Sequence, residues 1–254
     1  MRILRNLFLL MLFVLLLAVA LLALFPAKLA LQWVAPNLGS IQLDDVSGTI
    51  WNGRAGRLAV HQTELGALQW TLHPASLLSR RADIDLSLDG SEYRGQAFVR
   101  LLDGGTLALK DARIEFPAER LNAALDVPGL MPQGKVEVRL DEAELVAGFP
   151  RRLKGEAVWR NAAVAGEAAA EFGDLMAEFS TMPGGKITGI AKDLGGPLRV
   201  EGSFELGITG FDAEAILAAR DGNPQVVKAL GWIGEQQPDG SSLLKITGTL
   251  LPVR

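Results

Sequence analysis

Residues 82–89 read Ala-Asp-Ile-Asp-Leu-Ser-Leu-Asp, and this stretch decides the fold class. Its aliphatic and polar side chains alternate: Ile84, Leu86 and Leu88 with Asp83, Asp85 and Ser87. Successive side chains of a β-strand point to opposite faces, so a period of two predicts a strand with one buried and one wet face. Residues 135–140 repeat the pattern, with Val136, Val138 and Leu140 between Lys135, Glu137 and Arg139.

Similar short segments follow one another along most of the chain. They cover residues 55–60, 68–72, 93–102, 106–116, 153–164, 186–190, 198–206 and 243–250. Glycine, Asp-Gly and Pro-Gly punctuate them, and the 28 glycines suit tight hairpins, whose corners need positive φ. We predict a mainly β protein built on a long antiparallel sheet, twisted or curved if it stays open, sandwich-like if it closes.

A few short helices are predicted on this scaffold. Residues 74–78 and 117–122 each open with a proline, which the first turn of a helix tolerates. Asn223 is a suitable N-cap for a helix over residues 226–230, and Gly231 follows as its stop.

The N-terminus predicts a membrane anchor. No charged residue interrupts residues 6–27, a run about as long as the roughly 20 residues that span a bilayer. Arg2 and Arg5 precede it, so the positive-inside rule places residues 1–5 in the cytoplasm and the β-rich residues 28–254 in the periplasm.

The alternative is a cleaved signal peptide. Residues 18–20, Ala-Val-Ala, have the small-x-small form of a cleavage site, but they lie inside the apolar run. Cleavage there would leave residues 21–25 as an apolar new N-terminus, which favours a retained anchor. Trp33 suits either the outer membrane interface or the core of the domain.

Composition excludes several classes of function. The net charge is −4 without a long block of like charges, which argues against nucleic-acid binding. The chain has no cysteine, which excludes disulfides, thiolate zinc sites and thiol nucleophiles.

Catalytic and metal-binding patterns are weak. His61 and His73 are the two histidines, and Glu64 has the opposite strand parity to His61, so these three make a poor metal site. Asp44-Asp45 and the pair Asp83 and Asp85 are acids that a wet strand face also carries. The nucleophile-elbow, P-loop and dinucleotide fingerprints are missing from the sequence. We predict a non-enzymatic protein without metal or cofactor.

Two pairs of segments suggest an internal repeat, which we call the echo. One pair of segments is Gly48-Thr49-Ile50-Trp51-Asn52 followed by Leu65-Gly66-Ala67-Leu68. The other is Gly155-Glu156-Ala157-Val158-Trp159 followed by Phe172-Gly173-Asp174-Leu175. The interval from the tryptophan to the glycine is nearly the same in both pairs. Two similar β halves, residues 40–130 and 131–254, would explain it. Trp51, Trp70, Trp159 and Trp232 are candidates for an aromatic binding patch, but core packing is the favoured interpretation for Trp70 and Trp159.

The chain resembles the type II secretion system protein N family. The resemblance is carried by residues 25–27, 46–55, 65–74, 194–198, 202–206 and 220–231, and it is weakest over residues 100–150. The motif residues, expected to be structural, are Gly48, Trp51, Asn52, Gly53, Gly66, Trp70, Pro74, Gly196, Pro197 and Gly231. The resemblance implies an accessory, non-catalytic inner-membrane component that contacts other secretion subunits.

A looser similarity of layout to the AsmA-like envelope proteins suggests an alternative function, a groove that binds or guides lipid. This alternative predicts that Ile84, Leu86 and Leu88 line an open trough. A second layer over these residues would favour a packed interaction domain instead. A small-molecule substrate is not expected.

Overall fold

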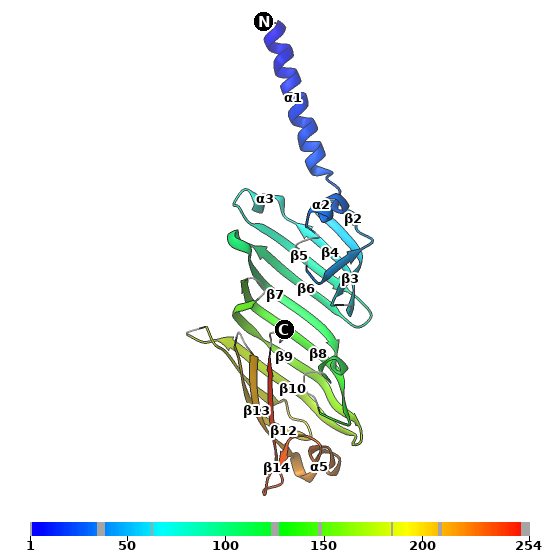
Figure 1. Ribbon diagram of the computed structural model, residues 1–254, viewed down its shortest axis with the longest axis vertical. Coiled ribbons are helices and arrows are strands. Elements are labelled where there is room, and N and C mark those ends of the chain that lie inside the picture. The colour runs from blue at the N-terminus through cyan, green and yellow to red at the C-terminus, as the bar shows by residue number, and fades with distance from the viewer. Residues whose placement is uncertain are drawn as a thin grey trace. The chain divides into compact units, whose positions relative to one another are not determined.

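The computed structural model describes residues 2–34, 39–61, 63–122, 127–146, 149–183, 185–207 and 210–249. Within them, 15 strands make a long antiparallel sheet, in an order that follows the chain almost throughout (Figure 1). The mainly β fold class is therefore confirmed. The chain divides into two compact units, Met1–Ser91 and Glu92–Arg254, which are described separately.

The described residues of unit 1 form five strands. They are β1 (Ile41–Asp44), β2 (Ser47–Gly48), β3 (Asn52–Val60), β4 (Thr63–Leu72) and β5 (Ala82–Asp89). The order is β1-β3-β4-β5, and the short β2 pairs with β3. Val60 at the end of β3 pairs with Thr63 at the start of β4, and His61, which follows Val60, adopts a positive φ of 48°.

Strand β5 confirms the alternation from which it was predicted, with one exception. Ile84, Leu86 and Leu88 are half-buried, whereas Asp85 and Ser87 are exposed. Asp83 was expected on the wet face, but it is buried at 8% exposure. The reason is the short helix α3 (Pro74–Leu77), whose Ser76 hydroxyl accepts a hydrogen bond from the Asp83 amide at 3.0 Å.

The N-terminal helix differs from its predicted bounds. Helix α1 covers Arg2–Ala23 rather than residues 6–27, and a separate helix α2 covers Ala27–Val34. The break lies at Pro26, because a proline disfavours the helical conformation of the residue before it. Over the residues that the structure describes, no helix reaches the combined length and apolarity needed to cross a membrane.

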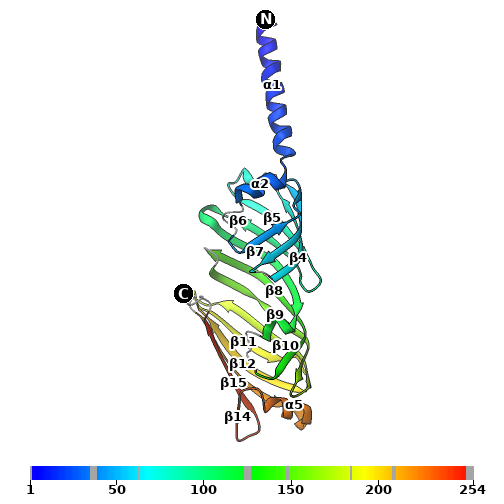
Figure 2. The same ribbon diagram turned by 45° about the vertical axis from the view of Figure 1, so that its right-hand side comes forward.

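Unit 2 contains the longest strands. They are β6 (Arg94–Leu101), β7 (Thr106–Pro117), β8 (Leu130–Val146), β9 (Phe149–Gly166), β10 (Ala170–Thr181), β11 (Ile187–Asp193), β12 (Leu198–Leu206), β13 (Gly210–Ala219), β14 (Glu235–Gln236) and β15 (Ser242–Thr249). Each pairs with the next along the chain, except that β15 lies between β13 and β14. Figure 2 shows these strands curling around one face of the unit.

The other two predicted short helices are also present. Residues 117–122 form a 3-10 helix, η3 (Ala118–Leu121), and the third is α5 (Pro224–Leu230). The Asn223 side chain caps α5 by accepting hydrogen bonds from the amides of Gln225 and Val226. Gly231 is the C-cap, so the start and the end of this helix were predicted correctly.

The core of unit 2 lies where α5 packs on the sheet. Val226, Ala229 and Leu230 of α5 are buried against apolar residues of several strands. The buried cluster comprises Leu130, Ala162, Val164, Ala168, Ala170, Phe172, Leu198, Val200, Leu217, Val226, Ala229, Leu230 and Ile233. These side chains fill one end of the curled sheet.

The predicted similarity of two halves, residues 40–130 and 131–254, stays a prediction. The two glycines of the echo do share their backbone geometry, since Gly66 has φ +121° and Gly173 has φ +89°. Each also faces a glycine of a following segment, Gly90 and Gly196 respectively.

Candidate functional site

An apolar cavity of about 440 Å³ lies on the inner face of unit 2. A volume of this size falls within the range of roughly 300–1,000 Å³ typical of small-molecule sites. Strands β7 to β13 and β15 all contribute to its lining. Representative lining residues are Phe116, Val138, Ala157, Trp159, Leu175, Ala177, Ala191, Val200, Phe204, Ala215, Leu217 and Leu244. Ile84, Leu86 and Leu88, predicted to line a trough, are not among them.

The floor of the cavity is a row of small residues that run across the sheet. Ala157 pairs with Ala177, Ala177 with Ala191, Ala191 with Gly202, and Gly202 with Ala215. The four alanines line the cavity. Because cross-strand partners share a face, these residues form one continuous strip, which we call the furrow.

Larger side chains stand on both sides of the furrow. Residues two positions away along a strand point to the same face, so they form the walls. On one side these are Trp159, Leu175, Val200 and Leu217. On the other side Phe204 of β12 lines the cavity beside Ala213 of β13, and Ile246 of β15 pairs with Ala213 and lines it as well. The indole nitrogen of Trp159 donates a hydrogen bond to the Gln133 carbonyl at 2.8 Å, which fixes this ring in place.

The charged residues beside the cavity already have partners. Lys192 Nζ lies 2.7 Å from a carboxylate oxygen of Glu178, and Lys245 Nζ lies 3.5 Å from one of Glu214. Among the described residues, no buried side-chain nitrogen or oxygen lacks a hydrogen-bond partner. The cavity therefore suits an apolar ligand better than a polar one.

The described residues contain no group of three or more side chains that could hold a metal ion. His61 and His73 are exposed, and the His73 ring contacts the Asp85 carboxylate at 2.6 Å. Asp44 pairs with Arg57 instead of forming an acid pair with Asp45. These contacts are those of surface ion pairs.

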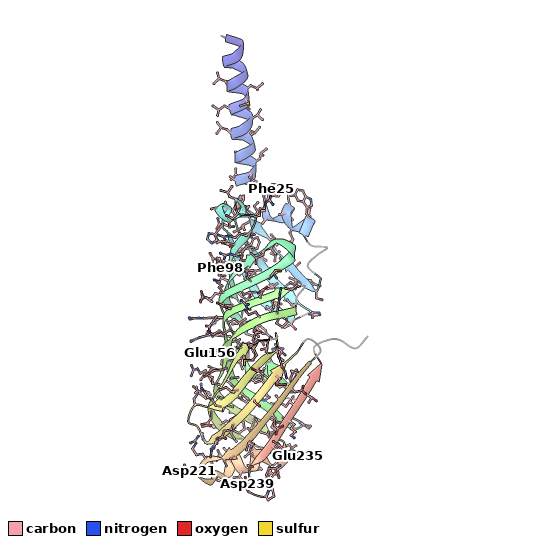
Figure 3. All side chains as sticks on the ribbon, turned by 90° about the vertical axis from the view of Figure 1, so that its left-hand side faces the viewer. Phe25, Phe98, Glu156, Asp221, Glu235 and Asp239 are labelled. Atoms are coloured by element: carbon pink, nitrogen blue, oxygen red, sulfur yellow. The ribbon has the colours of Figure 1, made fainter. Side chains whose placement is uncertain are left out.

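The family-motif residues of unit 1 gather where α1 ends. The Trp51 indole nitrogen donates to the Leu22 carbonyl at 2.9 Å, and the Ile50 amide donates to the Phe25 carbonyl at 3.1 Å. The Leu22 carbonyl, in the last turn of α1, also accepts from the Phe25 amide at 3.3 Å, so the Trp51 donor adds a second hydrogen bond there. Pro26 also bridges to Thr49, and Figure 3 shows Phe25 at the foot of α1. We call residues 48–53 the junction.

Trp70 and close backbone packing hold the shape of this junction. The Trp70 indole nitrogen donates to the Ile50 carbonyl at 3.2 Å, and its ring covers Gly53, where a Cβ would collide with it. Gly48 has φ +84°, and a Cβ there would lie 2.5 Å from the Asn52 carbonyl oxygen. Pro74 opens α3. These positions therefore make local contacts within unit 1.

Trp51, Trp70 and Trp159 are half-buried, and their indole nitrogens all have acceptors. Trp232 is exposed, at 47%, so the four tryptophans do not share one environment. Trp33 is 73% exposed, with its ring centroid 5.7 Å from that of Phe25, so the interpretation that it packs in the core is wrong.

The Gly196 and Pro197 motif of unit 2 forms the turn between β11 and β12. Asp193 holds this turn, since its carboxylate accepts from the amides of Gly195 and Val200, each at 3.0 Å. Arg220 Nη2 lies 2.6 Å from the same carboxylate. Burial raises the pKa of Asp193, but the two amide donors and Arg220 outweigh it and leave the pKa below its usual value.

Substituting Trp51 with phenylalanine is expected to loosen the junction by about 1 kcal/mol, because the Leu22 carbonyl loses the shorter of its two hydrogen bonds. Hydrogen exchange of the full chain in detergent should show faster exchange in residues 49–53. Trp33→Phe is the matched control, because the Trp33 side chain is largely exposed. Equal exchange in both variants would contradict a structural role for the Trp51 hydrogen bond.

Acid is expected to weaken unit 2 through Asp193. The pKa of Asp193 in the folded protein lies below the unfolded value of about 3.9. Its contribution to the free energy of unfolding is therefore fully present above about pH 3.9, and it is lost as the pH falls through the folded pKa. Between about pH 7 and pH 3, the Tm of the native chain should therefore fall further than that of Asp193→Asn. Asp212→Asn, at an exposed position of β13, is the matched control.

Comparison with known proteins assigns the family. The family model described as "Type II secretion system (T2SS), protein N" matches residues 39–244, which include the junction, the furrow and α5. The chain belongs to this family. The resemblance read from the sequence is thus confirmed.

Three relatives carry the printed name "Type II secretion system protein N". The Vibrio cholerae protein is 25% identical over 230 residues, which cover 85% of this chain and 86% of that protein. The Aeromonas hydrophila protein is 27% identical, over 95% of this chain and 84% of its own length. The Klebsiella pneumoniae protein is 29% identical over 150 residues, 58% of each chain. No solved structure matches this chain.

The family motif and the cavity are separate features. Motif recognition from the sequence found the junction and the turn at Gly196, but it missed the alanines of the furrow. An alanine side chain has no reactive or hydrogen-bonding group that would single it out in a sequence. Consecutive alanines of the furrow also lie 14 to 24 residues apart along the chain. The available signal was their shared strand face, which becomes visible only when the register is known.

Proposed function

We propose that this protein is an accessory, non-catalytic component of the type II secretion system, which supports export of folded proteins across the outer membrane through contacts with other secretion subunits. Its membership of the protein N family carries this proposal. The family model covers residues 39–244, which is most of the chain.

The edge of unit 2 formed by β15 is the proposed contact surface. β14 pairs only with Leu243 and Ser242, so residues 244–249 have no second strand beside them within the described parts of the chain. An open strand edge offers backbone N–H and C=O groups to an added strand. Thr247 is exposed on this edge.

A photo-reactive amino acid at Thr247 of the full chain, expressed in its own host, tests this contact. We expect a covalent adduct with a secretion subunit. The matched control is Glu201, an exposed residue of β12, which has paired strands on both sides. A chromosomal deletion should leave folded exoproteins in the periplasm. Normal export in the deletion strain, with no secretion subunit captured from Thr247, would refute the proposal.

The chain is also proposed to be held at the inner membrane by α1, with residues 28–254 on the periplasmic side. The described side chains of α1 are apolar and mostly exposed, with Phe13 at 63% and Leu21 at 63%. A helix that is apolar on every face needs an apolar environment. The choice of side rests on the sequence, through Arg2 and Arg5. Release of the intact chain by alkaline carbonate would refute this attachment.

A further inference from the structure

The furrow has a direction, and the direction restricts what can lie in it. Its small residues follow the register across β9, β10, β11, β12 and β13. Neighbouring strands lie about 4.8 Å apart, so a row across five strands runs for roughly 19 Å at right angles to the strands. The furrow is therefore long and narrow on the scale of a single extended chain, and it follows the curl of the sheet (Figure 2).

A peptide is a poor occupant of this furrow. Each of the five floor strands is paired on both sides, so their backbone N–H and C=O groups are used by the sheet. A peptide lying across them would bury its own backbone polar groups without partners, at a large cost in free energy. An α-helix, about 10–12 Å wide with its side chains, is also too wide for a floor bounded by rows two residues away.

A hydrocarbon chain meets neither obstacle. It carries no hydrogen-bonding group along its length, and it is narrow enough to lie on alanine and glycine between larger side chains. The charged residues near the cavity are already paired with each other, as Lys192 is with Glu178, so nothing in the furrow requires a polar ligand. Trp159, fixed by its bond to Gln133, offers an apolar wall.

We propose that the furrow binds one unbranched acyl chain of a membrane phospholipid, with the headgroup outside the cavity. The acyl chemistry rests on the furrow alone. The membrane as its source rests on the attachment proposed above for α1. This binding goes beyond the proposed role in secretion and needs no secretion subunit.

Photolabelling tests the proposal with the full chain reconstituted in phosphatidylethanolamine vesicles. The probe is a phosphatidylethanolamine whose acyl chain carries a diazirine, and adducts are mapped by mass spectrometry after illumination and proteolysis. We expect adducts on β9 to β13. Ala177→Phe places a ring on the floor and should lower this labelling by roughly tenfold, because the chain loses apolar contact along the strip. Labelling of α1, which lies outside the furrow, is the internal reference.

Ala218→Phe is the matched control. Ala218 is a half-buried residue of β13 that is paired with Arg199 and does not line the cavity. This variant should keep native labelling to within about twofold. Ala191→Phe is a second floor variant, and thermal unfolding followed by circular dichroism shows whether each variant is folded.

The outcomes separate the possibilities. Loss of β9 to β13 labelling in folded Ala177→Phe or Ala191→Phe, but not in Ala218→Phe, supports an acyl site. Labelling that is absent from these strands, or unchanged in both floor variants, overturns it, as does a peptide recovered crosslinked to the furrow. A normal export phenotype in the deletion strain, with no secretion subunit captured from Thr247, would refute the role in secretion while leaving this result unaffected.

Discussion

Replacing Gly196 with alanine is expected to destabilise unit 2 by about 3 kcal/mol, or roughly 6–12 °C in Tm for a domain of this size. The added Cβ would overlap the carbonyl oxygen of Phe172 and lie 2.8 Å from the Cα of Gly173. Both are backbone atoms of β10, so they can move aside only if the turn separates from this strand. Thermal unfolding of the full chain in detergent measures the effect.

The neighbouring Gly195 supplies the control. It has φ +97°, but a Cβ there would meet nothing within 4 Å, so Gly195→Ala costs only the strained backbone conformation, about 1 kcal/mol. The comparison separates close packing from conformational strain within a single turn. If the two variants lost the same stability, the packing of Gly196 on β10 would not be the reason that this position carries glycine.

The second large effect is expected at Leu230, which is 1% exposed in the core at the end of α5. Leu230→Ala leaves a void among Val226, Phe172 and neighbouring core residues, and it should cost about 3–4 kcal/mol. Thermal unfolding again gives the measure, because the loss should appear in the transition of unit 2.

Val227→Ala on the same helix is the matched control, since Val227 is 51% exposed. Its expected cost is about 0.5 kcal/mol or less. A small loss at Leu230 would mean that α5 is not an integral part of the core, and that the curled sheet is stable without this helix at its end.

Strong local signals made several elements predictable. The alternation over residues 82–89 predicted β5, and the Asn223 cap with Gly231 predicted α5, because both patterns are complete within a few residues. The family motif likewise consists of short blocks, so Trp51 and Gly196 were identified before their contacts were known. Asp83 shows the limit of predicting burial from local alternation, because its burial depends on the helix α3.

Five described strands were missed: the short strands β1, β2 and β14, and the longer strands β10 and β13. The two longer ones were missed for identifiable reasons. In β10 the register shifts near Gly173, which breaks the period of two in the sequence. In β13 the inward positions include Ala213 and Ala215, and alanine is a weak strand former that does not mark a buried face. Without these two strands, the residues on the inner surface of unit 2 could not be predicted from the sequence.

By itself, the sequence determined the β class, the short helices, the family and the apolar character of the N-terminal helix, because each depends on residues close together in the chain. Only the tertiary structure decided that Ala157, Ala177, Ala191 and Ala215 form one strip between larger walls. Strand pairing sets that strip, and a shift of one residue in any strand would turn its alanine to the opposite face.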